Sequence, residues 1–501
     1  MNIIFKKLLL SLSVICMLTC LSGCFEQKED SLISSVEELN GRDIGCMSGS
    51  IFDELIRKQF PDSEIIYFNS RSELLLGLTA GKIDGFISDE PVAMMMVSQN
   101  DQVSYLDEAV GQVEYGICFS DDSIEIMKEF NEYLSKINDN GHIEELRNKW
   151  IDPEGAQQKK TEYELSGING TIRCVTTPDA APFSFISNGV FQGYEVELLN
   201  EFCHEYGYDL EISTVSFDAL LTSVAMNKFD VAFNGIYITP ERSKSVNFCT
   251  PTYNGRDVVM IRNGNVAENK DFITTIKDSF YRNFIEEDRY KLLLSGAFTT
   301  LLISLFSIIC GTLLGLLIFM LSKACSPFGK LADIVQKLLA KLPAVVLLML
   351  LFYVAFKSSA ISGTLVSIIG FSFMFAHTFY GLLKSGVTSV DYGQTEAAMA
   401  LGYDSLKAFF HIILPQALKI VLDPYILEVI ALIKNTSIVG YVSVNDITRS
   451  SDIIRGRTYD ALFPLIVTAV IYYLLCTLLV VLIKKPIRDY IEKKVRYDDQ
   501  I

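Results

Sequence analysis

The sequence predicts two structural parts, an α/β domain followed by an all-α membrane bundle. From about Ser31 to Asn265, short strand-like runs alternate with amphipathic helical stretches, a pattern typical of α/β architecture. From Tyr290 onward, the chain becomes apolar in stretches near the length a helix needs to cross hydrocarbon. With 501 residues, of which 50% are hydrophobic, the chain is too long for one ordinary domain and apolar enough to include a membrane part.

The first residues have the features of a secretory signal. Lys6 and Lys7 precede an apolar run that ends at Leu21-Ser22-Gly23-Cys24. This ending resembles the lipobox of bacterial lipoproteins, which implies that residues 1–24 are a signal peptide and that Cys24 is acylated. An uncleaved signal anchor is the alternative. Either one predicts that the following domain is exported.

Cysteine spacing and charge argue against two classes of site. The eleven cysteines are scattered without a CxxC motif or a Cys/His cluster, so no metal or other cofactor is expected. The net charge of -17 argues against a nucleic-acid partner. Five cysteines fall in the exported part, most of them in apolar strand-like runs where buried free thiols are expected: Cys46, Cys118, Cys174, Cys203 and Cys249.

The exported part consists of two complementary blocks. Residues 31–152 contain LNGRDIGCMSGSIFDELIRKQF and LLLGLTAGKIDGFISDEP and end in NEYLSKINDNGHIEELRNKW. This block resembles the second lobe and C-terminal helices of the amino-acid-binding proteins that serve ABC importers. Residues 160–264 contain TIRCVTTPDAAPFSFISNGVFQGYEVELLNEF and resemble the first lobe of the same family. The resemblance implies a bilobed domain of the periplasmic-binding-protein type II fold.

The two blocks stand in an unusual order. The family usually runs from lobe one to lobe two and then to the C-terminal helices, whereas here the lobe-two block comes first. We predict one circularly permuted domain in which a linker such as Asp152–Gly170 joins the usual termini. The alternative is two incomplete domains in sequence, which leaves two half-sites and no clamp.

The resemblance also implies an amino-acid site. Such a site must neutralise a carboxylate and an ammonium group in a dehydrated cleft. Arg242, in ITPER, matches the position that grips the ligand carboxylate, and Asp89, in ISDEP, matches the acid that holds the ammonium group. Phe217 matches an aromatic residue that packs on the ligand side chain. Backbone donors near Gly235 and around Ser50 are expected to complete the carboxylate site.

Three positions depart from the family pattern. Ala180 stands where an aromatic residue commonly stacks on the ligand, and Tyr237 stands where a small hydroxyl residue usually binds the ligand carboxylate. Thr177 occupies a position that is often acidic, which removes one indication of a cationic ligand. Glutamine, glutamate, cystine and several other ligands therefore stay open.

A linker at residues 265–289 leads to a predicted transmembrane domain at residues 290–485 and a cytoplasmic tail at residues 486–501. In this domain Gly311 and Gly315 form a small-xxx-small face suited to close helix packing. The charges of Lys323, Lys330 and the basic tail place the C-terminus inside the cell. We predict about five spans: Leu292–Leu321, Val335–Ala355, Ile361–Leu383, Ile420–Val442 and Leu462–Ile483.

A loop between two of these spans carries the most specific motif. Asp391–Gln416 reads DYGQTEAAMALGYDSLKAFFHIILPQ, a spacing that predicts two short helices joined at Gly402. It resembles the cytoplasmic coupling loop of ABC importer permeases of the polar amino-acid type. The resemblance implies that an ATPase docks on the motif residues Glu396, Ala397, Ala398, Gly402, Ile412, Leu414 and Pro415.

Two charged residues follow this loop. Lys434, in IKNTSIVGYV, matches the KDTSL segment of the same permeases. Glu428 is costly if it faces lipid, so we expect it to make a polar contact on a translocation path or a hydrogen bond between helices.

These features predict the substrate-binding and permease subunit of an ABC importer for a polar amino acid, a multi-pass protein of the bacterial cell membrane. One bundle of this type I permease class makes half a pathway, so a homodimer is expected. The sequence contains no G-x-x-x-x-G-K-[ST] motif, so the ATPase is a separate dimer and the chain is not an enzyme. The alternative is a ligand-gated channel or a transmembrane sensor, but no TVGYG-like filter or signalling domain follows the last span.

Overall fold

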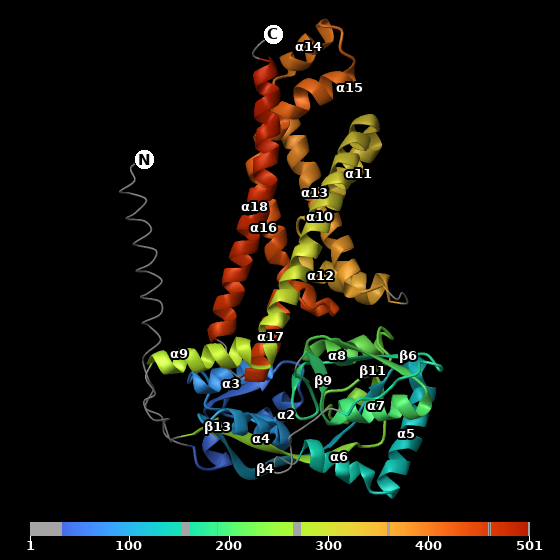
Figure 1. Cartoon of the computed structure of the whole chain (residues 1–501), viewed down its shortest axis with the longest axis vertical. Helices are drawn as coiled ribbons and strands as arrows, with labels where there is room; N and C mark the ends of the chain where they lie inside the picture. Colours follow the sequence, from blue (N-terminus) through green and yellow to red (C-terminus); the bar gives the residue numbers. More distant parts are fainter. Residues whose placement is uncertain are drawn as a thin grey trace.

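The computed structural model describes residues 33–151, 161–187, 189–263, 272–357, 361–458, 460 and 462–498. An α/β domain lies at one end of the molecule, and long helices extend from it to the other end (Figure 1). The predicted signal peptide with Cys24 and most of the segment between the two α/β blocks lie outside the described residues.

The first sheet of the α/β domain, with its helices, is called lobe A here. Its strand order is β2-β1-β3-β13-β4. The central strands pair in parallel, and β13 pairs antiparallel with β3 and with β4. The elements are β1 (Asp43–Met47), α2 (Phe52–Gln59), β2 (Glu64–Phe68), α3 (Arg71–Thr79), β3 (Gly85–Asp89), α4 (Glu90–Gln99), β4 (Val103–Tyr115) and β13 (Tyr253–Arg262).

The second sheet and its helices form lobe B, with strand order β10-β6-β11-β5-β12. Here β6, β10 and β11 pair in parallel, and β5 pairs antiparallel with β11 and β12. The strands are β5 (Cys118–Phe119), β6 (Thr171–Thr176), β10 (Asp209–Thr214), β11 (Val231–Ala232) and β12 (Asn247–Phe248). The helices are α5 (Ile124–Asp139), α6 (His142–Trp150), α7 (Tyr194–Tyr206) and α8 (Phe217–Ala225), and a small sheet joins β7 (Asp179–Ala180), β8 (Ser184–Ser187) and β9 (Val190–Gln192).

Each lobe is built from both blocks of the sequence. Strand β5 comes from the earlier block but lies between β11 and β12 of the later block. Conversely, β13 comes from the later block but lies between β3 and β4 of the earlier block. Helices α5 and α6 pack on lobe B, where the Tyr133 hydroxyl donates to Glu201 at 2.7 Å and the Trp150 ring nitrogen donates to Glu197. Neither block therefore closes its sheet without the other.

Buried apolar strands account for the state of the cysteines in this domain. The five cysteines of the α/β domain are all buried and free. This confirms the prediction of buried thiols, which followed from the apolar runs around them.

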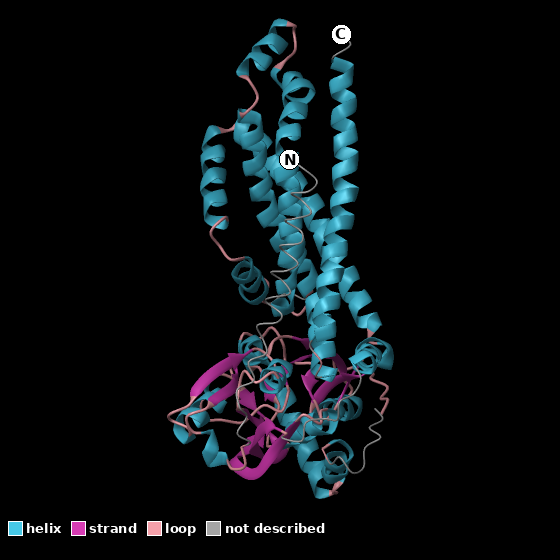
Figure 2. Ribbon diagram, turned by 90° about the vertical axis from the view of Figure 1, so that its left-hand side faces the viewer, coloured by secondary structure: helices cyan, strands magenta, loops and turns pink. Residues whose placement is uncertain are grey.

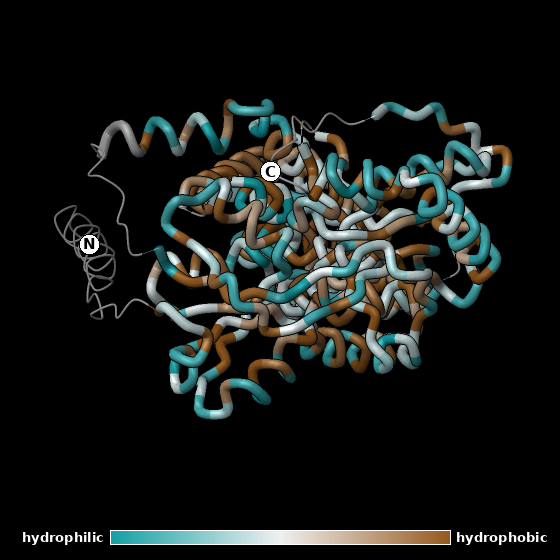
Figure 3. The backbone as a smooth tube through the Cα atoms, turned by 90° about the horizontal axis from the view of Figure 1, so that it is seen from below, coloured by the Kyte–Doolittle hydropathy of each residue, from teal (hydrophilic) through white to brown (hydrophobic). Residues whose placement is uncertain are grey.

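The helical bundle stands on the α/β domain, and its long helices extend away from that domain along the length of the molecule (Figures 1 and 2). Viewed from the α/β side, long stretches of the bundle are coloured as hydrophobic, whereas the α/β domain is mixed (Figure 3). Among the described residues, three helices are long and apolar enough to cross a membrane, or up to four if a bent pair is one span. The main helices are α10 (Tyr290–Ala324), α11 (Ser326–Leu339), α12 (Ala344–Met349), α13 (Gly363–Thr388), α16 (Leu414–Asn435), α17 (Ile447–Thr458) and α18 (Leu462–Asp498).

The bundle differs from the predicted spans in two places. The predicted span Val335–Ala355 is not a straight helix, because α11 and the helix from Ala344 to Ala355 meet at 109°. Pro343 caps the second helix, and a proline disfavours helical backbone at the residue before it. The predicted span Ile420–Val442 ends its α-helix at Asn435 and continues as a 3-10 helix, Thr436–Val442. The total of five spans therefore stays a prediction.

Two segments flanking the bundle are more helical than predicted. The linker at residues 265–289 contains α9 (Phe272–Phe280), followed by a π-helical turn, Tyr281–Ile285. At the other end, α18 continues past residue 485 to Asp498, through what was predicted as the tail.

Small residues set the spacing of the two most extensively packed helices, α10 and α13. A Cβ atom added to Gly311 lies 2.9 Å from the Ser372 carbonyl oxygen, and one added to Gly315 lies 2.6 Å from the Ala376 carbonyl oxygen. Both distances are shorter than a carbon atom tolerates, so the helices approach closely only because these positions lack side chains.

Candidate functional site

A small closed cleft lies between the two lobes of the α/β domain. Its cavity has a volume of about 20 Å³, room for about one water molecule and far too little for an amino acid. Six of the eight residues predicted to bind ligand line it together. The lining residues are Met47, Ser50, Ile51, Phe52, Arg71, Asp89, Phe217, Gly235, Tyr237 and Arg242.

Arg242 spans the cleft from lobe B. It opens the short 3-10 helix that follows β11, and its Nη1 donates to the Tyr237 carbonyl oxygen at 3.2 Å. Its Nη2 donates to the Gly49 carbonyl oxygen of lobe A, also at 3.2 Å. Burial lowers the pKa of Arg242 from its usual value, but a guanidinium group stays charged in proteins. Two backbone carbonyl oxygens therefore accept hydrogen bonds from the Arg242 guanidinium group, which was predicted to bind the ligand carboxylate.

Tyr237 also spans the cleft and contacts two carboxyl groups of lobe A. Its hydroxyl group makes a short hydrogen bond to Asp89 Oδ1 and lies 2.7 Å from Asp257 Oδ1. The Tyr115 hydroxyl donates to the same Asp89 oxygen at 3.0 Å. In this closed form, the tyrosine hydroxyl groups occupy the Asp89 oxygen that was predicted to bind a ligand ammonium group.

The contacts of Tyr237 also determine where protons lie. A tyrosine hydroxyl group has a single proton, so it donates to one of the two acids and accepts from the other, which must be protonated. Burial, together with the nearby charge of Asp89, raises the pKa of Asp257 to about 7. We therefore assign the extra proton to Asp257, which then donates to the Tyr237 hydroxyl group while that hydroxyl group donates to Asp89.

Sequence reasoning missed four cleft residues, of which Arg71 is the only charged one. It is the first residue of α3, and only 6% of its surface is exposed. Its guanidinium carbon lies 5.7 Å from the centre of the Phe217 ring, across the cleft, and its Nη2 lies 3.8 Å from Asp89 Oδ2. The available signal was its position at a helix start directly after β2, since loops at the carboxyl ends of parallel strands line ligand crevices.

The predicted residues Ser50 and Gly235 line the cleft, but their backbone groups are partly engaged. The Gly235 N–H group donates to Glu195 Oε2 at 2.8 Å, and the Ser50 N–H group donates to the Met47 carbonyl oxygen at 3.0 Å. Gly235 has φ of +63°, and a Cβ atom there lies 2.8 Å from the Phe183 ring. Packing therefore requires that Gly235 has no side chain, and its N–H group is bonded to Glu195 in this closed form.

Two predicted residues do not line the cleft. Ala180 is fully buried in β7. Thr177 is also buried, and its Oγ1 lies 2.7 Å from both Asn234 Oδ1 and Asp179 Oδ1. Both residues support the loop between β6 and β8 beside the cleft.

A second, larger cavity of about 210 Å³, called the interface cavity here, lies between the two lobes and the helical bundle. Ser70 and Ser216 line it, and each directly precedes one member of the Arg71–Phe217 pair in the cleft. The two cavities are therefore lined by adjacent residues of the chain at both positions. The remaining lining residues are Asn69, Glu73, Pro178, Asp179, Ser437, Gly440, Tyr441, Asp446, Thr448, Arg449 and Asp452.

Polar contacts around the interface cavity hold the α/β domain on the bundle. Arg449 Nη2 donates to the Val215 carbonyl oxygen at 2.8 Å, and Thr214 Oγ1 donates to Asn445 Oδ1 at 3.1 Å. Farther along lobe B, Lys228 donates to the Phe356 carbonyl oxygen at 3.1 Å. The bundle thus holds lobe B at three positions.

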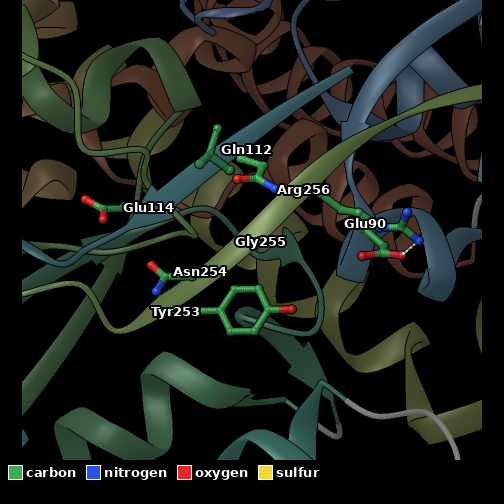
Figure 4. Close-up of a pocket in the computed structure, with 8 residues that line it drawn as sticks. Glu90, Gln112, Glu114, Tyr253, Asn254, Gly255 and Arg256 are labelled. Carbon is green, nitrogen blue, oxygen red and sulfur yellow. Dashed lines mark hydrogen bonds and ion pairs between the residues drawn. The ribbon is translucent and has the colours of Figure 1, made fainter. Parts of the chain in front are cut away.

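A larger recess of about 650 Å³ lies elsewhere, along β4, β13 and the start of α4. Figure 4 shows its side chains spread along the strands, with Arg256 facing Glu90. Arg256 pairs with Glu90 at 2.5 Å and with Asp107 at 2.8 Å. Among the described residues, the only cation that lines this open recess is thus already paired, and its other ionic group, Glu114, is an exposed carboxylate without an opposite charge beside it, so the cleft is the better candidate for an amino acid.

The predicted coupling loop lies at the end of the bundle farthest from the α/β domain (Figure 1). It consists of α14 (Tyr392–Ala400) and α15 (Ser405–Ala408), and Gly402 between them has φ of +86°. This confirms the predicted pair of short helices joined at the glycine. Pro415 lies in the first turn of α16, as its spacing predicted.

The surface of this loop exposes large apolar side chains beside the predicted motif residues. Glu396 and Ala397 are exposed, and Ala398 packs inward. Three large apolar side chains beside them are exposed to 73%, 78% and 67%: Tyr392, Leu401 and Leu406.

The two charged residues predicted near a translocation path lie on α16. Glu428 is half-buried, and Lys434 is exposed near the end of the helix. Neither makes an ion pair among the residues that the structure describes.

Comparisons with known proteins match both parts of the chain. Residues 172–395 match the bacterial extracellular solute-binding proteins, family 3, and residues 311–497 match the binding-protein-dependent transport system inner membrane component. A solved structure described as an amino acid ABC transporter with histidines is 25% identical, with a TM-score of 0.37, and covers 45% of this chain and 100% of that chain.

Two curated relatives from Bacillus subtilis (strain 168) each match at 30% identity. The "Probable amino-acid ABC transporter permease protein YckA" aligns over 217 residues, which is 41% of this chain and 90% of the relative. The "Arginine transport system permease protein ArtQ" aligns over 210 residues, which is 41% of this chain and 94% of the relative. The chain therefore belongs to the family of binding-protein-dependent inner-membrane transport components, joined in one polypeptide to a region of the extracellular solute-binding proteins of family 3.

Proposed function

We propose that this chain is both the receptor and the permease subunit of an ATP-driven importer for a polar amino acid. The observation that carries the proposal is that Arg242 and Asp89, one from each lobe, meet in a single cleft. They supply the cation and the anion that a free amino acid requires. The same chain carries the coupling loop at its opposite end, so ligand capture and ATPase docking belong to one molecule.

The α/β domain is proposed to be one solute-binding domain with permuted lobe order. The exchange of β5 and β13 between the two sheets supports this view over two incomplete domains in sequence. The family 3 match begins at residue 172, in β6, where the permuted reading places the first strand of the usual order. The segment at residues 152–170 then joins what are ordinarily the two termini.

Transport is proposed to proceed by opening and closing of this cleft above the bundle. Ligand binding closes the lobes, and a separate pair of cytosolic ATPase subunits contacts the loop around Glu396 and moves the helices as rigid bodies. Two copies of the chain form the pathway, so each complex carries two tethered receptors. Tethering replaces diffusional capture by an effective concentration of about millimolar for a short linker.

The membrane setting follows from the same scheme. The chain lies in the bacterial inner membrane, with the α/β domain outside and the C-terminus in the cytoplasm. Residues 1–24 act as the export signal, and acylation of Cys24 adds a lipid anchor. The chain itself hydrolyses no ATP.

A charge reversal in the coupling loop tests the proposal. In membrane vesicles loaded with ATP, Glu396→Lys is expected to abolish amino-acid uptake and ligand-stimulated ATP hydrolysis, while ligand affinity stays unchanged. The matched control is Glu108→Lys, the same charge reversal at an exposed position of β4, which is expected to leave uptake intact. Normal uptake by the Glu396 variant would defeat the assignment.

A further inference from the structure

The cleft contains a buried cation that the amino-acid site described above does not use. Arg71 is 6% exposed, lines the cavity and carries a guanidinium group with five N–H donors. Among the residues that the structure describes, it donates no hydrogen bond and has only the 3.8 Å ion pair with Asp89 and the contact with the Phe217 ring. Such a buried group normally has hydrogen-bond partners, so its acceptor is expected to come from outside the chain.

The charges in the cleft do not balance around a neutral amino acid. Three charged residues line the cavity: Arg71, Asp89 and Arg242. A bound zwitterion brings its carboxylate to Arg242 and its ammonium group to Asp89. The one negative charge of Asp89 is then shared between the ammonium group and Arg71, for which the described residues supply no other ion pair, so one positive charge stays buried without a counter-charge, which is strongly unfavourable.

The nearby acids behind the cleft do not restore the balance. Glu195 is fully buried and accepts the Gly235 N–H group, and burial raises its pKa to about 8, so most of it is uncharged at neutral pH. Asp257 contacts Tyr237, and its pKa is raised to about 7. Neither forms an ion pair with Arg71 in the part of the chain that the structure describes.

We propose that Arg71 binds a second carboxylate, on the side chain of the ligand, and that this importer takes up an acidic amino acid of the glutamate or aspartate class. The proposal rests on the function proposed above. Phe217, the ring expected to pack on the ligand side chain, is the ring over which Arg71 lies. Arg71 is therefore placed at the side-chain end of the ligand, while Arg242 takes the α-carboxylate.

A guanidinium fork suits this role because it matches a carboxylate in two parallel hydrogen bonds. An amide side chain offers one neutral acceptor and leaves most of the charge of Arg71 uncompensated. A basic side chain adds repulsion. The cleft must open before any ligand enters, since Tyr237–Asp89 and Arg242–Gly49 now close it.

Equilibrium binding to the purified full-length chain tests the assignment. L-glutamate, L-aspartate, L-glutamine, L-asparagine and L-arginine are titrated separately, by calorimetry. The best acidic ligand is expected to bind about 10- to 150-fold more tightly than its amide, the range that one charge-assisted hydrogen-bonded contact supplies. Tighter binding of an amide or of arginine by the wild-type chain would overturn the acidic assignment.

Three variants separate the role of Arg71 from a general effect on the cleft. Arg71→Met keeps an apolar stem without the charge, and it is expected to bring the affinity ratio of acid to amide within a few-fold of one. Arg71→Lys keeps the positive charge but loses the two parallel N–H donors of the guanidinium group. This variant should retain part of the preference for the acidic ligand over its amide. Arg242→Met should abolish binding of acid and amide alike. An equal loss of both ligands in Arg71→Met would overturn the proposal, because it would place Arg71 on the α-carboxylate.

Folding and function have separate readouts in this design. The sole tryptophan, Trp150, lies buried in α6, so its fluorescence follows unfolding of the α/β domain in the full chain. If Arg71→Met does not fold, the ligand ranking of the wild type and of Arg71→Lys still decides the question. If no amino acid binds to the folded wild-type chain, the proposed function fails and this inference fails with it.

Discussion

The hydroxyl group of Tyr237 is expected to hold the empty cleft closed and to compete with the ligand. It joins lobe B to two acids of lobe A, Asp89 and Asp257, and one of these contacts is a hydrogen bond to a charged carboxylate. Tyr237→Phe keeps the ring and removes both contacts. Because a ligand must break the same contacts before it reaches Asp89, removing them lowers the cost of ligand entry.

The size of the effect follows from the kind of bond that is lost. A hydrogen bond to a charged group contributes about 1.5–3 kcal/mol. The ligand-free α/β domain of Tyr237→Phe is therefore expected to lose about that much unfolding free energy. If all of it favours the closed empty state, the apparent ligand affinity rises by up to about 10- to 150-fold.

The matched control removes the other hydroxyl group on Asp89. Tyr115 donates to Asp89 at 3.0 Å, but both residues belong to lobe A, so this bond does not cross the cleft. Tyr115→Phe is therefore expected to lose stability without a gain in ligand affinity. Urea unfolding followed by Trp150 fluorescence gives the stability, and calorimetry gives the affinity. An unchanged or weaker affinity in Tyr237→Phe would refute self-closure by this hydroxyl group.

Four further predictions concern other parts of the chain. The unfolding free energy of the α/β domain should fall as pH rises from about 4 to about 7. The reason is that Asp257 binds its proton with a pKa of about 7 when folded against a usual value of 3.8, and Asp257→Asn should flatten the profile measured by urea titration. We expect the substrate to cross the interface cavity on its way from the lobes to the bundle, so Gly440→Leu, which fills this cavity, should slow uptake without changing ligand affinity. The fold should tolerate the change, because a Cβ atom at Gly440 meets only Arg449, at 3.8 Å and beyond. Gly440→Ala is the mild control, and normal uptake by the leucine variant would contradict this route. Gly315→Leu should prevent assembly of α10 on α13, seen as loss of folded protein in detergent, because a Cβ atom there lies 2.6 Å from a carbonyl oxygen. Gly402→Val should strain the coupling loop by about 1–2 kcal/mol and uncouple ATP hydrolysis from ligand, whereas unaltered ligand stimulation of the ATPase would contradict its role as the turn.

Features that depend on neighbouring residues were predictable from the sequence. The coupling loop is the clearest case, because Gly402 and Pro415 impose backbone conformations within a few residues of themselves. The buried cysteines also followed from their apolar neighbours. The bend before Pro343 had a local signal as well, but a proline permits a break without setting its angle, and the 109° turn depends on what the two helices pack against.

Features of the cleft that depend on residues far apart in the chain were predicted only in part. Arg242 and Asp89 were found through their motifs, and the structure brings them together. Arg71 lies in no such motif, and its importance depends on Phe217, which is distant in sequence and belongs to the other lobe. The occupation of Asp89 by Tyr237 likewise depends on how far the lobes are closed, which sequence patterns do not report.

The sequence by itself predicted the two-part architecture and the two short helices around Gly402, because both depend on short-range periodicity or spacing, and the resemblance to the binding proteins predicted Arg242 and Asp89 as the opposite charges for an amino acid. Only the tertiary structure decided that the cleft is closed on itself, that β5 and β13 are exchanged between the sheets, and that the Arg71 guanidinium group lines the cleft without a hydrogen bond to any described residue. The physical reason is that burial, charge balance and hydrogen-bond satisfaction are properties of a folded neighbourhood. No sequence motif distinguishes Arg71 from an exposed arginine. Its charge can select among ligands only because the folded lobes bury it in the cleft.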